Sequence, residues 1–132
     1  MTPPSAAGVL MIAAAGAVGT LARFGLVSLT QAFIPQPTVP SVPAFPWGTL
    51  AVNLIGCLAM GILATALAHS VREDLRLALL VGLLGGFTTF SAFAWETHTL
   101  LAAGRTASAF LYVLASVGLG VLLVFAGTKL AG

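Results

Sequence analysis

Residues 85–93 read GGFTTFSAF and lie in the middle of the third long apolar stretch of the chain. A membrane helix should consist mostly of Leu, Val and Ala, but this segment holds two adjacent glycines, three hydroxyl side chains and three aromatic rings. The composition predicts a membrane helix that breaks here. Irregular backbone at membrane depth is tolerated only where protein buries it or where it lines a water-filled path, because lipid offers N–H and C=O groups no partners. The segment therefore points to an ion or a polar substrate that crosses a bilayer.

The composition of the whole chain indicates an integral membrane protein. Of its 132 residues, 59% are hydrophobic and 6% are charged, and the mean hydropathy is +1.11. One span takes about 20 residues, so we predict an all-α membrane protein with a single four-span transmembrane domain over residues 1–132. The expected spans are 6–32, 47–68, 77–102 and 106–129, and the third contains the break. We expect a multi-pass protein of the cell membrane, inner or plasma.

The charged side chains exclude some function classes. Five basic and three acidic residues give a net charge of +2, which is too small and too scattered for nucleic-acid binding. The sequence has no evident carboxylate pair, Ser-His-Asp set or metal-ligand cluster, so we expect no enzyme activity.

The basic residues are divided almost evenly between the two membrane faces. The face that holds the termini would have Arg72, Arg76 and Lys129, and the other face would have Arg105 and Arg23. This weak bias permits insertion in both orientations.

One face of the first span combines small residues with an arginine. Gly16, Gly19, Thr20 and Arg23 are spaced i, i+3, i+4 and i+7, so they share a helix face on which another helix can approach closely. An intramembrane arginine faces a partner, a cavity or an anion path. The alternative is that Arg23 extends to the lipid headgroups.

A polar stripe follows the second span at steps of four residues, formed by Thr49, Asn53, Cys57 and Gly61. The amide of Asn53 can hydrogen-bond a neighbouring helix or donate its NH2 group to an anion. Taken alone, this span favours the contact between helices.

The phenylalanines after the break are placed to meet an ion. Phe90 and Phe93 are three residues apart, so they project from one side of a resumed helix. The positive ring edge favours a desolvated anion without the tight hold of a fixed cation, although plain packing is the alternative.

Gly85 and Gly86 can adopt unusual backbone angles, and the threonine hydroxyls can replace lost hydrogen bonds. Carbonyls freed in this way can coordinate a cation such as Na+.

Three ordered segments resemble signatures of the small Fluc/CrcB fluoride channels, and the resemblance covers essentially the whole chain. They are GAVGTLARF at 16–24, GTLAVNLIG at 48–56 and GGFTTFSAF at 85–93. The resemblance implies an antiparallel, dual-topology homodimer that exports fluoride passively. A cell-negative potential of 100 mV drives each anion outward by about 2.3 kcal/mol.

The resemblance also implies roles for individual residues. By motif position, Phe90 and Phe93 are the pore phenylalanines and Asn53 is the pore amide. The backbone carbonyls of Gly85 and Thr88 are expected to hold a structural Na+ at the dimer interface.

The same resemblance places Arg23 near an aqueous vestibule. Glu96 and His98 follow the break, and we expect that they either face this vestibule or are solvated at the membrane interface.

The chain departs from the family pattern in the polar track beyond the phenylalanines. Ala92 and Ala94 stand at two positions where the family usually has hydroxyls. Ser91, Thr49 and Tyr112 are the remaining candidates to line the path.

Two other functions fit a small four-span protein. A proton-coupled multidrug exporter needs a carboxylate deep in its first span, where this chain offers only Arg23. A non-transporting membrane subunit would use the glycines and Asn53 for packing and would pass no ions alone.

Overall fold

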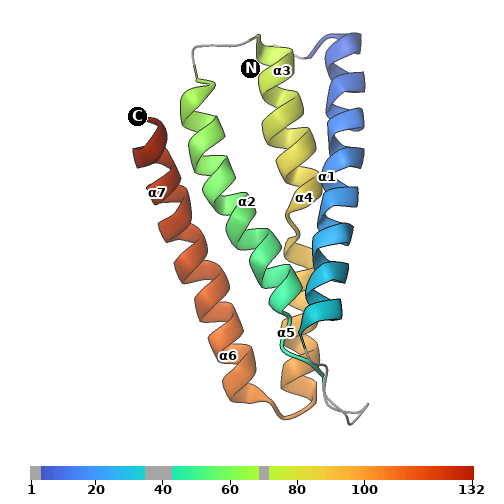
Figure 1. Cartoon of the computed structure of the whole chain (residues 1–132), viewed down its shortest axis with the longest axis vertical. Helices are drawn as coiled ribbons and strands as arrows, with labels where there is room; N and C mark the ends of the chain where they lie inside the picture. The colour runs from blue at the N-terminus through green and yellow to red at the C-terminus, as the bar shows by residue number, and fades with distance from the viewer. Residues whose placement is uncertain (1–3, 35–42, 69–71) are drawn as a thin grey trace.

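The computed structural model describes residues 4–34, 43–68 and 72–132, and its regular elements are helices. Four segments are long and apolar enough to cross a membrane, which confirms the predicted number of spans (Figure 1). They are Ala6–Phe33, Trp47–Ala66, Glu73–Ala102 and Thr106–Ala131.

The first two spans are single helices, and the last two are composite. The first span is α1 (Ala6–Phe33) and the second is α2 (Trp47–Ala66). The third span consists of α3 (Glu73–Leu77), the π-helix η1 (Ala78–Leu84), α4 (Gly85–Phe87) and α5 (Phe90–Ala102). The fourth consists of α6 (Thr106–Leu114), the π-helix η2 (Ala115–Leu119) and α7 (Gly120–Ala131).

The helix ends differ from the prediction by a few residues. The third span begins at Glu73 rather than at residue 77, because Glu73 and Asp74 in the first turn complement the positive end of the helix dipole. The second span ends at Ala66 and the fourth continues to Ala131. From Pro37 to Pro46 a proline recurs at every third residue, which predicts a polyproline II segment between the first two spans. Residues 35–42 lie outside the described residues, and the last part of the segment, residues 43–46 (the connector), is described.

The third span does break, but at its threonines rather than at its glycines. Gly85 keeps right-handed helical angles (φ −63°, ψ −37°), and Gly86 lies inside α4. Thr88 (φ −84°, ψ 159°) and Thr89 (φ −151°, ψ 120°) are extended. The expectation of unusual angles at the two glycines was wrong. Gly86 is needed for packing instead, since a Cβ there would overlap the carbonyl oxygen of Gly16 in α1.

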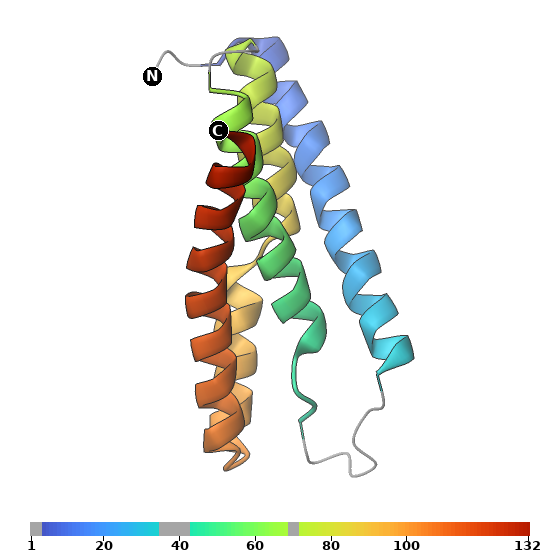
Figure 2. The same cartoon turned by 60° about the vertical axis from the view of Figure 1, so that its left-hand side comes forward.

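The break gives the two halves of the third span different neighbours. Before it, α3, η1 and α4 pack against α1; after it, α5 packs against α6 and touches α2 (Figures 1 and 2). The second span packs mainly against α7. The start of α1 and the end of α7 lie at one end of the bundle, and the α5–α6 hairpin lies at the other.

Glycines let the helix backbones approach one another. In α1, a Cβ on Gly19 would overlap the carbonyl of Leu83, which confirms that this face accepts a close helix. Between α2 and α7, Gly61 and Gly127 allow the same close approach.

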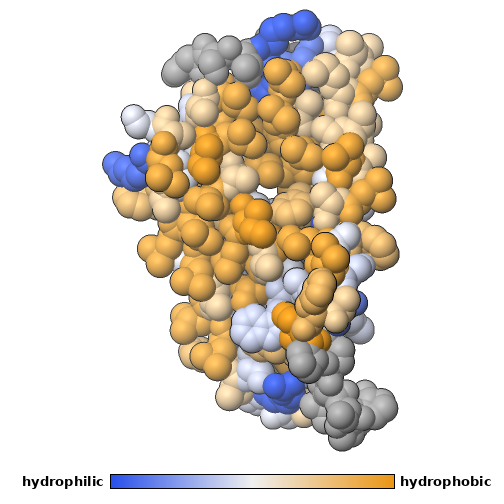
Figure 3. Space-filling view, in the orientation of Figure 1, coloured by the Kyte–Doolittle hydropathy of each residue, from blue (hydrophilic) through white to orange (hydrophobic). Residues whose placement is uncertain are grey.

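Large apolar side chains point outward, and Figure 3 shows a mostly hydrophobic face with hydrophilic residues toward its ends. Such a surface suits lipid or a second membrane subunit.

Candidate functional site

The side chain of Asn53 in α2 holds the broken backbone. Its Nδ2 donates to the carbonyl oxygen of Thr89 at 3.0 Å, and its Oδ1 accepts from the amide of Thr89 at 2.8 Å. The expected contact between helices is therefore present. One helical turn further, a Cβ on Gly56 would overlap the Cγ2 of Thr88, so α2 lies directly on the break.

The two threonines close the helix ends on either side of the break. The amide and the Oγ1 of Thr88 both donate to the carbonyl of Leu84, each at 2.9 Å. The Oγ1 of Thr89 accepts from the amide of Ala92 at 3.2 Å and caps α5. Threonine hydroxyls thus replace lost backbone hydrogen bonds, as the sequence predicted. The amide of Thr89, which an unbroken helix would direct to the carbonyl of Gly85, donates to Asn53 instead.

A groove of about 280 Å³ runs beside the break. Phe90 and Phe93 line it with ring centroids 5.5 Å apart, and Phe90 is 79% exposed. Its other lining residues are Asn53, Gly56, Cys57, Met60, Thr88, Thr89, Ser116 and Val117. The Oγ of Ser116 is buried and has no hydrogen-bond partner among the described residues. The groove therefore joins ring edges, an amide and hydroxyls in a largely apolar wall.

A carboxylate with two hydroxyl partners lies beyond the phenylalanines. The Oγ1 of Thr49 donates to Oε1 of Glu96 at 2.6 Å, and the hydroxyl of Tyr112 donates to Oε2 at 2.7 Å. Tyr112 is completely buried. The three residues come from α2, α5 and α6, so this cluster fixes three spans relative to one another.

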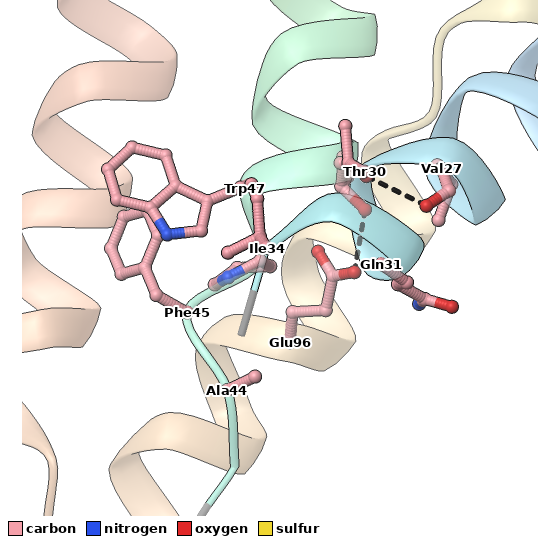
Figure 4. A pocket seen from close by; sticks show the side chains of 11 residues that line it. Val27, Thr30, Gln31, Ile34, Ala44, Phe45, Trp47 and Glu96 are labelled. Atoms are coloured by element: carbon pink, nitrogen blue, oxygen red, sulfur yellow. Dashed lines mark hydrogen bonds between the residues drawn. The ribbon is translucent and has the colours of Figure 1, made fainter. Parts of the chain in front are cut away.

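Glu96 also faces a cavity of about 160 Å³ near the end of α1 (Figure 4). The wall combines the last turns of α1, the end of the connector and the start of α2. It consists of Val27, Thr30, Gln31, Ile34, Ala44, Phe45, Pro46, Trp47, Gly48, Thr49 and Glu96. Glu96 therefore lines this cavity, and its place at an aqueous vestibule stays a prediction.

A continuous column of aromatic rings connects this cavity with the groove. Neighbouring ring centroids are 4.5 Å apart for Trp47 and Phe45, and 5.6 Å apart for Phe45 and Tyr112. The column continues from Tyr112 to Phe93 at 5.2 Å and from Phe93 to Phe90 at 5.5 Å. Trp47 and Phe45 at one end of the column line the cavity, and Phe93 and Phe90 at the other end line the groove.

Other residues singled out from the sequence lie at its edge or outside it. Arg23 lines neither space, but it precedes Val27 of the cavity wall by four residues and shares its helix face. Ser91 contacts the hydroxyl of Thr89 at 3.3 Å and is exposed. His98 is exposed and stacks on Trp95, with centroids 5.7 Å apart.

Sequence reasoning missed the part played by Phe45 and the contact of the Thr89 backbone with Asn53, and it gave Trp47 no place in the site. The available signal was an aromatic pair that directly follows a proline segment and begins a span. The link between Thr49, Glu96 and Tyr112 was also missed, because hydrogen bonds across 47 and 16 residues leave no local pattern.

The chain is similar to proteins of one family over most of its length. Residues 10–128 match the family described as CrcB-like protein, Camphor Resistance (CrcB). A fluoride-specific ion channel FluC of Paracoccus denitrificans (strain Pd 1222) is 49% identical over 118 residues, 89% of each chain. Channels of the same name are 45% identical in Geobacter sulfurreducens (93% of this chain, 95% of the relative) and 43% identical in Rhizobium meliloti (92% and 94%). Four apolar spans, a broken third span and a match over most of the sequence place this chain in the CrcB-like family of membrane proteins.

Proposed function

We propose that this protein is a fluoride-specific ion channel that lets fluoride leave the cytoplasm passively. The observation that carries the proposal is the groove at the break, where the rings of Phe90 and Phe93 meet the amide of Asn53. Relatives of nearly the same length bear the name fluoride-specific ion channel. The protein is therefore a channel rather than an enzyme.

The groove suits a small anion that must move quickly. All of its lining residues are uncharged, so no fixed cation among them would trap the ion. Ring edges of Phe90 and Phe93 supply weak positive potential. Asn53 has one Nδ2 hydrogen beyond the bond to Thr89, and the hydroxyl of Ser116 is unpaired among the described residues. A series of weak contacts of this kind allows fluoride to enter the groove and to leave it again.

Beyond the rings, the ion path continues toward the cavity beside Glu96. Thr49 lines this cavity, and its hydroxyl and that of the buried Tyr112 hold both carboxylate oxygens of Glu96. Arg23, one turn from the cavity wall, contributes positive potential to the vestibule. Ser91 lies next to Thr89 and extends the hydroxyl surface at the groove.

The open side of the groove calls for a second copy of the chain. Phe90 is 79% exposed, and the neighbouring polar side chain of Ser91 is exposed as well, at a depth where lipid offers it no further partner than Thr89. An antiparallel homodimer would cover these groups and enclose a pore on each side.

The break also provides donors for a structural Na+ at the interface of that dimer. The carbonyl of Gly85 does not receive the hydrogen bond that the Thr89 amide would donate in an unbroken helix, and the helical hydrogen bonds end at Thr88. Carbonyl oxygens suit a hard cation, and among the described residues no group of three or more His, Cys, Asp or Glu side chains could hold a metal. Gly85 and Thr88 would therefore supply the ligands through their backbones.

Fluoride efflux from liposomes tests the proposed function. Purified protein is reconstituted, and release of fluoride and of chloride is followed with ion-selective electrodes. We expect fluoride to leave much faster than chloride, and Phe90→Ile or Phe93→Ile to suppress its release because an aliphatic side chain lacks the polar ring edge.

Phe125→Ile is the matched control. Its ring is 62% exposed on α7 and contacts Lys129 rather than the groove, so release should stay at the wild-type rate. Equal chloride and fluoride release would exclude a fluoride-specific channel. Unchanged release in both groove variants would remove these rings from the path.

A further inference from the structure

Arg105 joins two parts of the molecule that are distant in sequence. It precedes α6 at the turn of the α5–α6 hairpin. Its Nη1 donates to the carbonyl oxygen of Pro43, 62 residues away, and its Nη2 donates to the Oγ of Ser108 at 3.1 Å. The bond to Ser108 orients the planar guanidinium, so the other nitrogen is aimed at the connector.

The tethered connector carries a ring of the aromatic column. Phe45 lies two residues after Pro43, packs edge-on against Tyr112 at 75°, and lines the cavity beside Glu96. Tyr112 in turn contacts Phe93 and donates to Glu96. A continuous series of contacts therefore runs from the guanidinium to the groups that border the ion path.

The packing of Phe45 against Trp47 and Tyr112 holds the second half of the connector. The carbonyls of Phe45 and Pro46 also accept from amides of α2, whereas the carbonyl of Pro43 accepts from Arg105. Residues 43–46 form no regular element, and prolines at positions 43 and 46 have no N–H to donate. Ordering such a segment costs roughly 1–2 kcal/mol of backbone entropy per residue. A charge-assisted hydrogen bond to one of its carbonyls is strong enough to offset part of that cost.

We propose that Arg105 is a positioning residue of the fluoride path. By holding the Pro43 carbonyl it keeps Phe45 against Tyr112, and it thereby sets the ring and the hydroxyl beside Glu96. This inference rests on the proposed function. Positioning by Arg105 differs from electrostatic attraction of fluoride by its positive charge. Such an attraction would act through solvent and would weaken as the salt concentration rises.

The test compares fluoride release by wild type, Arg105→Ala, Phe45→Leu and the double variant, reconstituted at less than one dimer per liposome. At this density a folding defect lowers the fraction of liposomes that release fluoride, whereas a positioning defect slows release from each active liposome. We expect Arg105→Ala to slow the rate per active liposome about tenfold, a barrier increase of about 1.4 kcal/mol. The double variant should be no slower than Phe45→Leu.

The salt dependence separates positioning from charge, and Arg105→Lys supplies a rescue variant. Because Lys keeps the charge and a donor nitrogen, its rate should lie closer to wild type than to Arg105→Ala under either explanation. The ratio of wild-type to Arg105→Ala rates should not change when an impermeant salt is raised from about 0.1 M to about 1 M, which shortens the Debye length from about 10 Å to about 3 Å. Arg72→Ala is the control, because that side chain is 86% exposed at the other end of the bundle.

The inference is overturned if Arg105→Ala leaves the rate per active liposome unchanged, if its effect adds to that of Phe45→Leu, or if the rate ratio falls toward one in high salt. If Arg105→Ala does not yield folded protein, the same cycle with Arg105→Met, which keeps the aliphatic stem but has no donor, decides. A wild-type protein that releases no fluoride would instead refute the proposed function.

Discussion

The side-chain amide of Asn53 supplies the hydrogen-bond partners of both the N–H and the C=O of the Thr89 backbone. In Asn53→Asp, one carboxylate oxygen would face the Thr89 carbonyl, and a negative charge would enter the groove. The Thr89 carbonyl would lose its hydrogen-bond donor, and leaving a buried carbonyl unsatisfied costs about 1–3 kcal/mol. We expect a lower unfolding temperature in detergent and fluoride release slowed by more than about tenfold.

Cys57→Ser is the companion variant for this prediction. It lies one turn further along α2, lines the same groove and introduces a hydroxyl without charge. Its unfolding temperature and release rate should remain near wild type. An Asn53→Asp protein that melts and conducts like wild type would show that the clamp on Thr89 is dispensable.

The hydroxyl of Tyr112 donates a hydrogen bond to Glu96 that the sequence did not predict. Tyr112→Phe keeps the ring in the aromatic column but leaves Oε2 of Glu96 without its donor, while Thr49 still serves Oε1. We expect a loss of about 1–3 kcal/mol in stability, measured by thermal denaturation, together with slower fluoride release. Retention of full stability would mean that solvent or a second subunit satisfies this oxygen.

At the scale of the helix, the close approach of α1 to η1 and α4 depends on particular glycines. A Cβ on Gly19 would overlap the backbone carbonyl of Leu83, which cannot rotate away, whereas a Cβ on Gly25 would meet no atom within 4 Å. Gly19→Ala should therefore cost about 1–3 kcal/mol by overpacking. Gly25→Ala should be neutral or stabilising by up to about 1 kcal/mol, because alanine favours the helix.

Thermal unfolding of the two purified variants checks this pair. Both substitutions add one methyl group to the same helix, so their difference reports the helix contact rather than helix propensity. Similar unfolding temperatures would contradict the packing of α1 described above.

The sequence predicted the existence of each span and of the break, because hydropathy and composition are local properties. It located the irregular backbone less well. A pair of glycines signals both flexibility and close packing, and only the contact between Gly86 and Gly16 distinguishes the two. Asn53, Phe90 and Phe93 were expected near one another, whereas the cluster around Glu96 depends on how three spans meet. Such meeting points are set by tertiary packing and have no signature within a single helix.

At the scale of the whole molecule, dual topology makes a direct prediction about accessibility. In a Cys57→Ser background, Ala103→Cys places one exposed thiol at the α5–α6 hairpin. We expect a membrane-impermeant maleimide to label part of the population in intact cells and the remainder only after lysis, because chains insert in both orientations.

A cysteine at Leu67, at the opposite end of the bundle, should give the same divided pattern. The Cys57→Ser parent without an added thiol sets the background. Labelling of Ala103→Cys entirely before lysis, or entirely after it, would establish one orientation and refute the antiparallel dimer.

The shared carboxylate of Glu96 has a consequence for biosynthesis. Ribosomes deliver α2, then α5, then α6, so Thr49 is in place when Glu96 enters the bilayer but Tyr112 is not. The second oxygen stays without its protein donor until the last hairpin inserts. A nascent chain that stalls before residue 112 would therefore carry an incompletely satisfied polar group in the membrane, where a quality-control protease can distinguish it from the finished protein.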